Sequence, residues 1–250
     1  MSSGTAFPDA ALEWLAPPRV DDARILLLGR PTAALAGRLS DAGADLAVTD
    51  PQPTAVQALL KQAPGALPAV ADPAQLPYIP CAFDAVVAHQ SLHTVDIAPV
   101  LAEFARVLAP GGRVALSWTV RDDSVPWVRR LAALMRAVDP EAMTGDYGAD
   151  TGAALEESRF FTEVETRRVR LWVPISRIDL LDMVARRFPD LEPDRRRDLL
   201  TRVGELYESS AKAPTPLLLP YQVVCWRARV DHTEFTSALD LPDLGLPISL

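Results

Sequence analysis

The stretch FDAVVAHQSLHTVDIAPVLAEFARVLAPGGRVALSW, residues 83–118, contains a complete strand–helix–strand pattern. Residues 83–88 form a short, almost continuously apolar run, which is typical of a strand that is buried on both faces. Residues 97–108 repeat apolar side chains at helical spacing, and the turn PGG at 110–112 separates them from an apolar run at 113–118. This order predicts a right-handed crossover between two parallel strands.

The same alternation extends toward both ends of the chain. The predicted strands are 24–28, 45–49, 67–71, 83–88, 113–118, 162–173 and 220–230, and the predicted helices are 32–42, 54–62, 97–108, 125–138, 176–187 and 193–211. No crossover helix stands directly before the last strand in the parallel sense, so we expect that strand to lie antiparallel beside its predecessor. The pattern predicts an α/β fold, a doubly wound and mostly parallel sheet covered on both faces.

The length of 250 residues suits one α/β domain. We expect a single domain at 1–230, with helical lid insertions at about 139–160 and 174–213 and a C-terminal tail at 231–250. The glycine-rich residues 145–152 within the first insertion suggest mobility. The apolar end of the tail, LPDLGLPISL, is expected to pack on its own domain or on a partner.

Charge and hydropathy exclude several classes of partner. The net charge is −8, whereas binding a nucleic acid requires a basic face. No apolar run approaches the roughly 20 residues that a membrane-spanning helix needs, and no secretory signal is visible. Cys81 and Cys225 are far apart and suggest core thiols in a reducing compartment. We therefore expect a cytoplasmic protein with a small-molecule substrate, no nucleic acid and no membrane.

Acidic residues stand where two predicted strands end. Ligands on such sheets bind beyond the carboxyl ends of the strands. Asp50 ends the second strand and suits a ribose, because a carboxylate can accept hydrogen bonds from both hydroxyls. Asp72 follows the third strand and can accept from an adenine amino group. The alternative is that both acids only cap turns, since a proline follows each.

Together and in this order, these features resemble the class I S-adenosylmethionine-dependent methyltransferases, in the small-molecule branch called methyltransferase type 11. Residues 76–118 carry the most telling part, and the turn ARVLAPGG is the commonest signature of the family. The stretch WTVRDDSVPWV at 118–128 resembles the W-N-x-R-D run of one subgroup, with Thr119 where asparagine is usual. The opening FPDAALEWL also matches that subgroup, so the resemblance covers nearly the whole chain.

The resemblance implies a Rossmann-like sheet of seven strands with the last strand antiparallel. It places S-adenosylmethionine across the ends of the first four strands. The residues implied to bind this cofactor are Gly29, Arg30, Asp50, Asp72, Pro73 and His89. Asp50 would hold the ribose hydroxyls, Asp72 would contact the adenine amino group, and His89 would end its strand and order the following loop.

The glycine loop departs from the family pattern. The family reads D-x-G-x-G-x-G where this chain has LLGRPTA at 27–33, so only Gly29 is kept. Pro31 fixes φ and lacks an amide donor, and Ala33 adds a methyl group. Arg30 either pairs with the carboxylate of the cofactor or fills the place of its charged methionine part. Losses of about 1–3 kcal/mol each would weaken cofactor binding or abolish it.

Candidate residues for the methyl acceptor come from the ends of the fourth and fifth strands. His93 is the candidate general base, since the ordinary pKa of histidine suits proton removal at neutral pH; the alternative is that it only lines the pocket. Trp118, Arg121 and Asp122 are candidates for substrate binding, with a core tryptophan and a surface ion pair as alternatives. The spacing of His89 and His93 crosses a strand end and lacks a third ligand, so no metal site is expected.

Two functions remain open from the sequence. The first is an S-adenosylmethionine-dependent methyltransferase that acts on a small molecule. The second is an inactive protein of the same fold, with lost or altered cofactor binding, that binds another ligand or a protein partner; the residues 29–33 motivate it. Neither the methyl acceptor nor the oligomeric state follows from the sequence.

Overall fold

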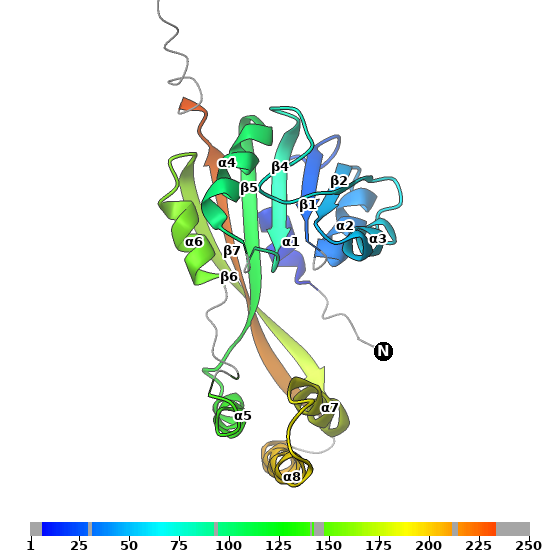
Figure 1. The fold of residues 1–250 in the computed structure, drawn as a ribbon, viewed down its shortest axis with the longest axis vertical. Helices are drawn as coiled ribbons and strands as arrows, with labels where there is room; N and C mark the ends of the chain where they lie inside the picture. Colours follow the sequence, from blue (N-terminus) through cyan, green and yellow to red (C-terminus); the bar gives the residue numbers. More distant parts are fainter. Residues whose placement is uncertain are drawn as a thin grey trace, which may run out of the picture. The chain divides into compact units, whose positions relative to one another are not determined.

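The computed structural model describes residues 7–29, 32–92, 95–140, 142, 148–211 and 215–233 (Figure 1). The helices are α1 (Asp9–Leu15), α2 (Ala33–Asp41), α3 (Pro53–Leu60), α4 (Ile97–Val107), α5 (Pro126–Arg136), α6 (Ala149–Glu156), α7 (Arg177–Arg187) and α8 (Pro193–Ser210). The strands are β1 (Arg24–Leu28), β2 (Asp45–Asp50), β3 (Leu67–Val70), β4 (Phe83–His89), β5 (Leu108–Arg121), β6 (Phe161–Ile175) and β7 (Leu217–Val230).

The strands form one seven-stranded sheet in the order β3-β2-β1-β4-β5-β7-β6. β3, β2, β1, β4 and β5 pair in parallel. At the other edge, Arg227 of β7 binds Glu165 of β6, and Arg229 binds Glu163. Residue numbers that rise on one strand and fall on the other are the mark of an antiparallel pair. The predicted doubly wound sheet with an antiparallel last strand is confirmed.

The central strands are apolar because both faces of the sheet are covered. Residues 25–28 of β1 and 85–88 of β4 are buried, as expected for parallel strands between helical layers. Arg24, the first residue of β1, is exposed and forms an ion pair with Asp84 of β4, with Nη2 3.2 Å from Oδ1. The change from charged to apolar residues along β1 therefore marks the boundary of the core.

The predicted crossover at 83–118 is present, with one difference in its second strand. Asp96 caps α4 by accepting a hydrogen bond from the amide of Ala98. β5 begins at Leu108 and not at 113, because the pairing with β4 jumps from Phe83–Leu108 to Ala85–Arg113. The predicted turn at 110–112 is therefore an irregularity inside a longer strand, and Gly111 has a φ of +80° there.

The sequence does not predict α1, whereas α6 lies inside the insertion at about 139–160 that the sequence predicts to be helical. α1 is short, and Arg227 holds it: its guanidinium lies 4.5 Å from the ring centre of Trp14 and donates to the Trp14 carbonyl. α6 occupies part of the glycine-rich stretch for which mobility was suggested. Gly152 in α6 approaches the indole of Trp226 so closely that an added Cβ would lie 2.4 Å from Nε1. This glycine therefore serves close packing.

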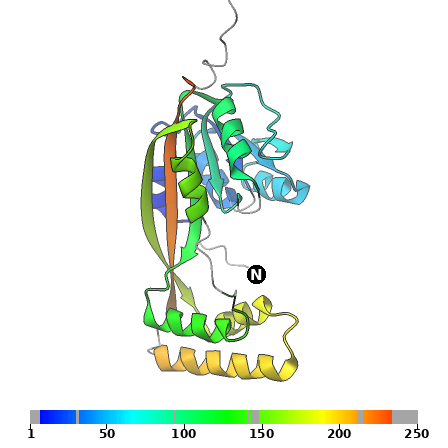
Figure 2. The ribbon, with the colours of Figure 1, turned by 60° about the vertical axis from the view of Figure 1, so that its left-hand side comes forward.

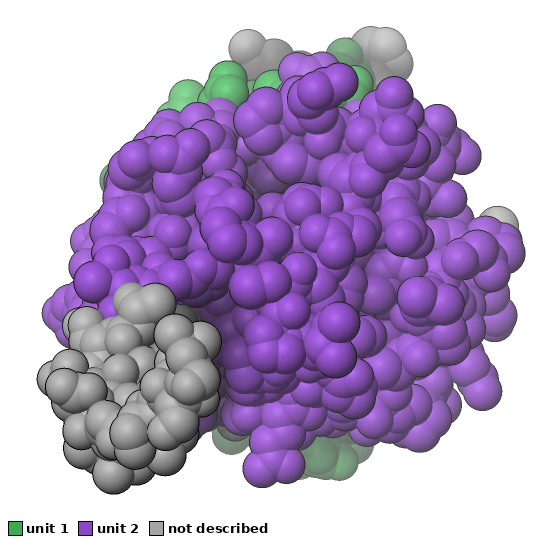
Figure 3. Space-filling view, turned by 90° about the horizontal axis from the view of Figure 1, so that it is seen from above, with its two compact units in different colours: residues 1–11, 118–148, 167–224 green, residues 12–117, 149–166, 225–250 purple. Residues whose placement is uncertain are grey.

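The chain divides into two compact units, which Figure 3 colours separately. The first comprises residues 1–11, 118–148 and 167–224, and the second comprises 12–117, 149–166 and 225–250. The expected single domain at 1–230, with insertions at about 139–160 and 174–213, stays a prediction. α7 and α8 belong to the first unit, whereas α6 belongs to the second.

In the first unit, α5, α7 and α8 pack together (Figure 2). Buried residues at helical spacing, such as Leu131, Val184 and Val203, fill their shared core. In the second unit, α4 and α6 line a common groove of about 480 Å³.

None of the described helices has the length and the apolar character of a membrane span. Cys225 is a buried thiol as expected, but Cys81 is exposed, so its predicted core position is wrong.

Candidate functional site

A small cavity lies at the carboxyl ends of the parallel strands in the second unit. Its volume is about 20 Å³. Its walls come from the ends of β1 and β2, from the segment after β3 and from the segment after β4: Leu28, Gly29, Thr49, Asp50, Pro51, Ala71, Pro73, Ser91 and Leu92. Parallel strands bring these segments together because their carboxyl ends meet at one edge of the sheet.

Gly29 is the first residue after β1 and begins the turn there. Its φ is +87°, a backbone conformation that residues with a Cβ rarely adopt. Its amide donates to the Thr49 carbonyl, and its own carbonyl accepts from the Thr32 hydroxyl at 2.6 Å. A Cβ added here would lie 2.2 Å from the Cβ of Ser91. The glycine is therefore required both by its backbone and by its neighbour.

The two predicted acids lie around this cavity. Asp50 lines it directly, and Asp72 stands between Ala71 and Pro73, which both line it. Each acid also caps a turn: Asp50 accepts from the amide of Gln52 and Asp72 from that of Ala74, both at 2.8 Å. Because a carboxylate accepts several hydrogen bonds, the turn-capping role and the ligand-binding role are compatible.

Ser91 covers Gly29 and was not singled out from the sequence. Gln90, the residue before it, has a φ of +50° and turns the chain after β4. The Ser91 hydroxyl is shielded from solvent and has no hydrogen-bond partner among the described residues. A buried polar atom without a partner is costly, and such atoms often mark a ligand site. The position directly after a buried strand was the only sequence signal for this residue.

The side chains around the cavity match the chemistry of a nucleoside. Carboxylates, an unpartnered hydroxyl and the apolar walls of Pro51, Ala71 and Leu92 match the ribose and the base of adenosine. The volume of about 20 Å³ holds roughly one water molecule. The donor set therefore fits adenosine in its chemistry, although the cavity as described is smaller than a nucleoside.

His89 lies in the core at the end of β4. Its side chain is 5% exposed, and its Nδ1 lies 2.9 Å from the Ser117 hydroxyl of β5. Burial lowers the pKa of His89 from 6.5 to about 4, so the ring is neutral at pH 7. His89 ends its strand as expected, but it is absent from the described lining of the cavity. Its contact with a cofactor stays a prediction.

The candidate acceptor residues lie in the first unit. Trp118 is buried, and Asp122 is only 4% exposed. Asp122 accepts from the amide of Ser124, and Arg170 Nε lies 3.2 Å from its Oδ2. Hydrogen bonds from Ser124 and from a neighbouring glutamine, together with the charge of Arg170, hold the pKa of Asp122 below its usual value. The acid is therefore a buried and charged group.

Arg121 forms an ion pair with the neighbouring Asp123. Its Nε donates to Asp123 Oδ1 at 2.8 Å, and Arg136 lies 3.7 Å from the other oxygen of Asp123. Arg121 therefore forms an ion pair with Asp123, and its contact with a substrate stays a prediction.

The structure leaves some predicted residues untested. Arg30 and His93 lie outside the described residues. Gly29, Asp50, Asp72, Pro73 and His89 fall in the second unit, whereas Trp118, Arg121 and Asp122 fall in the first. Within the described part of the chain, no three histidine, cysteine, aspartate or glutamate side chains gather as metal ligands would.

Known proteins with similar sequences cover most of the chain. A family model described as "Methyltransferase domain" matches residues 26–116. Uncharacterized methyltransferases of Mycobacterium tuberculosis and Mycobacterium bovis are each 32% identical over 232 residues, which is 89% of this chain and 89% of each relative. An uncharacterized methyltransferase of Schizosaccharomyces pombe is 42% identical over 52 residues, 21% of each chain.

Solved structures share the fold. A protein of Anaeromyxobacter dehalogenans assigned as a type II methyltransferase matches with a TM-score of 0.61 at 19% identity, over 90% of this chain and 97% of the other. A protein of Bacillus halodurans assigned as a methyltransferase matches with a TM-score of 0.56 at 15% identity, over 88% and 97%. The order of the sheet, the matching domain and the mycobacterial relatives agree: this chain belongs to the class I S-adenosylmethionine-dependent methyltransferase family.

Proposed function

We propose that this protein transfers a methyl group from S-adenosylmethionine to a small molecule. The observation that carries the proposal is the cavity at the ends of β1 and β2, where Gly29 with its positive φ faces Asp50 and the turn at 71–73. A backbone without a Cβ next to an acid at the end of the second strand suits a cofactor that bears a ribose.

Different residues around the cavity would contact the ribose and the base of adenosine. Asp50 would accept from the ribose hydroxyls and Asp72 from the adenine amino group. Pro51 and Leu92 would lie against the base, because both line the cavity with apolar atoms. When bound, the cofactor supplies a methyl group on a positively charged sulfur, which a nucleophile can attack directly.

The protein's own part in such a transfer is to orient the acceptor, to exclude water and to take a proton where the acceptor carries one. His93, four residues after His89, is our candidate for holding that proton. His89 itself is unsuited, since burial keeps its pKa at about 4. Trp118, Arg121 and Asp122 remain our candidates for contacts with the acceptor.

A small molecule is the acceptor class that we propose, and the net charge of −8 supports it over a nucleic acid. We also propose that the protein works in the cytoplasm and apart from membranes. The methyl acceptor itself is to be found by screening, once cofactor binding is established.

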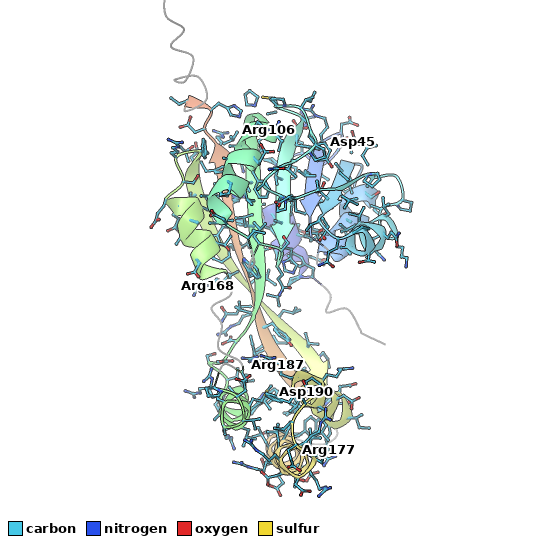
Figure 4. All side chains as sticks on the ribbon, viewed as in Figure 1. Asp45, Arg106, Arg168, Arg177, Arg187 and Asp190 are labelled. Carbon is cyan, nitrogen blue, oxygen red and sulfur yellow. The ribbon has the colours of Figure 1, made fainter. Side chains whose placement is uncertain are left out.

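Calorimetric titration with S-adenosylmethionine and S-adenosylhomocysteine tests the proposal. We expect micromolar binding by the wild-type protein, and we expect Asp50→Ala to weaken it roughly 10- to 100-fold, because it removes charged hydrogen bonds of about 1.5–3 kcal/mol. Asp45→Ala is the matched control, since Asp45, labelled in Figure 4, begins the same strand and is exposed. This control should bind as the wild type does.

Two results would contradict the proposal. One is the absence of binding up to millimolar concentrations of either ligand. The other is an equal loss of affinity in Asp50→Ala and Asp45→Ala, which would mean that Asp50 has no special contact with the ligand. Either result would return attention to the inactive alternative and to other ligands of the same cavity.

The altered glycine loop gives a separate prediction. If the loop has only lost favourable contacts, the double substitution Pro31→Gly and Ala33→Gly should tighten S-adenosylhomocysteine binding roughly tenfold, since each position regains a close approach of the backbone. Unchanged or weaker binding in the same titration would show that the loop is adapted to its present sequence. Ala36→Gly in the body of α2 controls for a general loosening of this helix.

A further inference from the structure

The segment between β3 and β4 carries Asp72 at its start, and one side chain of α4 holds its middle. We propose that Arg106 is a positioning residue for the adenine side of the cavity, because its guanidinium fixes the loop at 74–81 that follows Asp72. This inference rests on the proposed function. It assigns a task to the arginine of the turn ARVLAPGG, which the resemblance to the family leaves without one.

Arg106 spreads its guanidinium over two carbonyls of the loop. Nη1 donates to the Tyr78 carbonyl at 2.8 Å, and Nη2 donates to the Leu76 carbonyl at 3.0 Å. The loop has no regular secondary structure between β3 and β4, so its carbonyls need partners from elsewhere. A single side chain thus satisfies two carbonyls that are two residues apart. Figure 4 labels this arginine on α4.

Glu103, one turn earlier on α4, binds Arg106, and these two side chains form what we call the clamp. Its two oxygens accept from Arg106 Nε at 2.6 Å and Nη2 at 2.8 Å, and Oε2 also accepts from the Leu76 amide at 2.9 Å. Both side chains are mostly buried, with 28% of Arg106 and 19% of Glu103 exposed. Arg106 holds the pKa of Glu103 below its usual value, so the pair stays charged at neutral pH.

A second tie joins the loop to the strand that carries Asp50. The Tyr78 hydroxyl lies 2.8 Å from Oγ1 of Thr49, which is fully buried beside Asp50. The Tyr78 ring also meets the Phe83 ring edge to face at 4.9 Å. With Arg106 on its carbonyl and Thr49 on its hydroxyl, Tyr78 connects α4 to the end of β2.

The position of Asp72 depends on this arrangement. The amide of Gln75 donates to the Asp72 carbonyl at 2.9 Å, and the amide of Ala74 donates to the Asp72 carboxylate. The next residue, Leu76, is the first that the clamp holds. Loosening the clamp therefore frees the turn that aims the carboxylate of Asp72. Lysine cannot replace the arginine, because one ammonium group lacks the planar fork that reaches both carbonyls and Glu103.

The test compares two ligands that differ only in the base. S-inosylhomocysteine carries a carbonyl oxygen where S-adenosylhomocysteine carries the amino group that Asp72 would contact. We expect the wild-type protein to prefer the adenine ligand, and we expect Arg106→Lys to lose roughly tenfold of this preference, about the value of one hydrogen bond. A substitution that only destabilises the fold would lower both affinities equally and leave the preference unchanged.

Arg24→Lys is the matched control, because Arg24 also forms a two-pronged pair, with Asp84, in the same compact unit. Its preference should equal that of the wild type. Glu103→Gln is a second variant in case Arg106→Lys does not fold; it keeps an acceptor for the Leu76 amide but removes the charge. Hydrogen exchange gives a reading without ligand: amides at 74–81 should exchange faster in Arg106→Lys and not in Arg24→Lys.

The outcomes separate this inference from the proposed function. A wild-type protein that binds neither ligand overturns the proposed function and this inference with it. A wild-type protein that prefers adenine, together with an Arg106→Lys variant that keeps the full preference, overturns the inference alone. Unchanged exchange at 74–81 in that variant also overturns it.

Discussion

Replacing Gly29 by alanine is expected to lower the free energy of unfolding by about 3 kcal/mol. The φ of +87° costs a residue with a Cβ about 1–2 kcal/mol. The new methyl group would also lie 2.2 Å from the Ser91 Cβ, and overpacking of this kind costs about 1–3 kcal/mol. Urea denaturation of the wild type and the variant measures the difference.

Gly111→Ala separates the two contributions. Gly111 has a similar φ of +80°, but an added Cβ there meets nothing within 4 Å. This control should therefore lose only the backbone part, about 1–2 kcal/mol. The double variant Gly29→Ala with Ser91→Gly should recover part of the loss, because the clashing Cβ is then gone. Equal losses in Gly29→Ala and Gly111→Ala would show that Ser91 does not lie on Gly29.

Acid should destabilise the protein through His89 by about 3 kcal/mol between pH 6.5 and 4. In the unfolded chain, His89 binds a proton near its ordinary pKa of 6.5, whereas burial lowers the pKa in the folded chain to about 4. The unfolded state therefore binds more protons in this window, so stability is full above pH 6.5 and falls as the pH decreases toward 4. Below pH 4 both states are protonated, and the contribution stops changing.

His89→Asn should remove this dependence, because an amide can meet the Ser117 hydroxyl without titrating near pH 6. Unfolding in urea at a series of pH values measures the difference between the two proteins. Protonation of carboxylates such as Glu103 also lowers the stability of the protein in acid, but it does so equally in both proteins. Parallel curves for the wild type and His89→Asn would contradict the buried and neutral histidine.

The sheet could be predicted from the sequence because its signals are local. The apolar runs at 24–28 and 83–88 predict buried strands. The first run has the bounds of β1, and the second ends one residue before β4 does. The acid at Asp50 and the glycine at Gly29 stand at the strand ends that the pattern defines. Period and turn residues depend only on near neighbours, so they are visible before any tertiary contact forms.

Other elements could not be predicted in this way. The early start of β5 at Leu108 depends on pairing with Phe83, and nothing within 109–112 reveals it. The short helix α1 is held by Arg227, far along the chain. Propensity over seven residues is too weak to decide a helix, whereas a cation over an aromatic ring and a hydrogen bond decide it in the folded protein.

The sequence by itself determined the order of the strands and of most helices, and it placed Gly29 and the acids Asp50 and Asp72 at the carboxyl ends of the strands. Only the tertiary structure decided that Ser91 lies over Gly29, that Arg121 pairs with Asp123, and that Arg106 holds the loop after Asp72. The reason is physical. Periodicity records which face of an element is buried, but the partners of a polar side chain depend on register and loop paths, which exist only once the sheet is assembled.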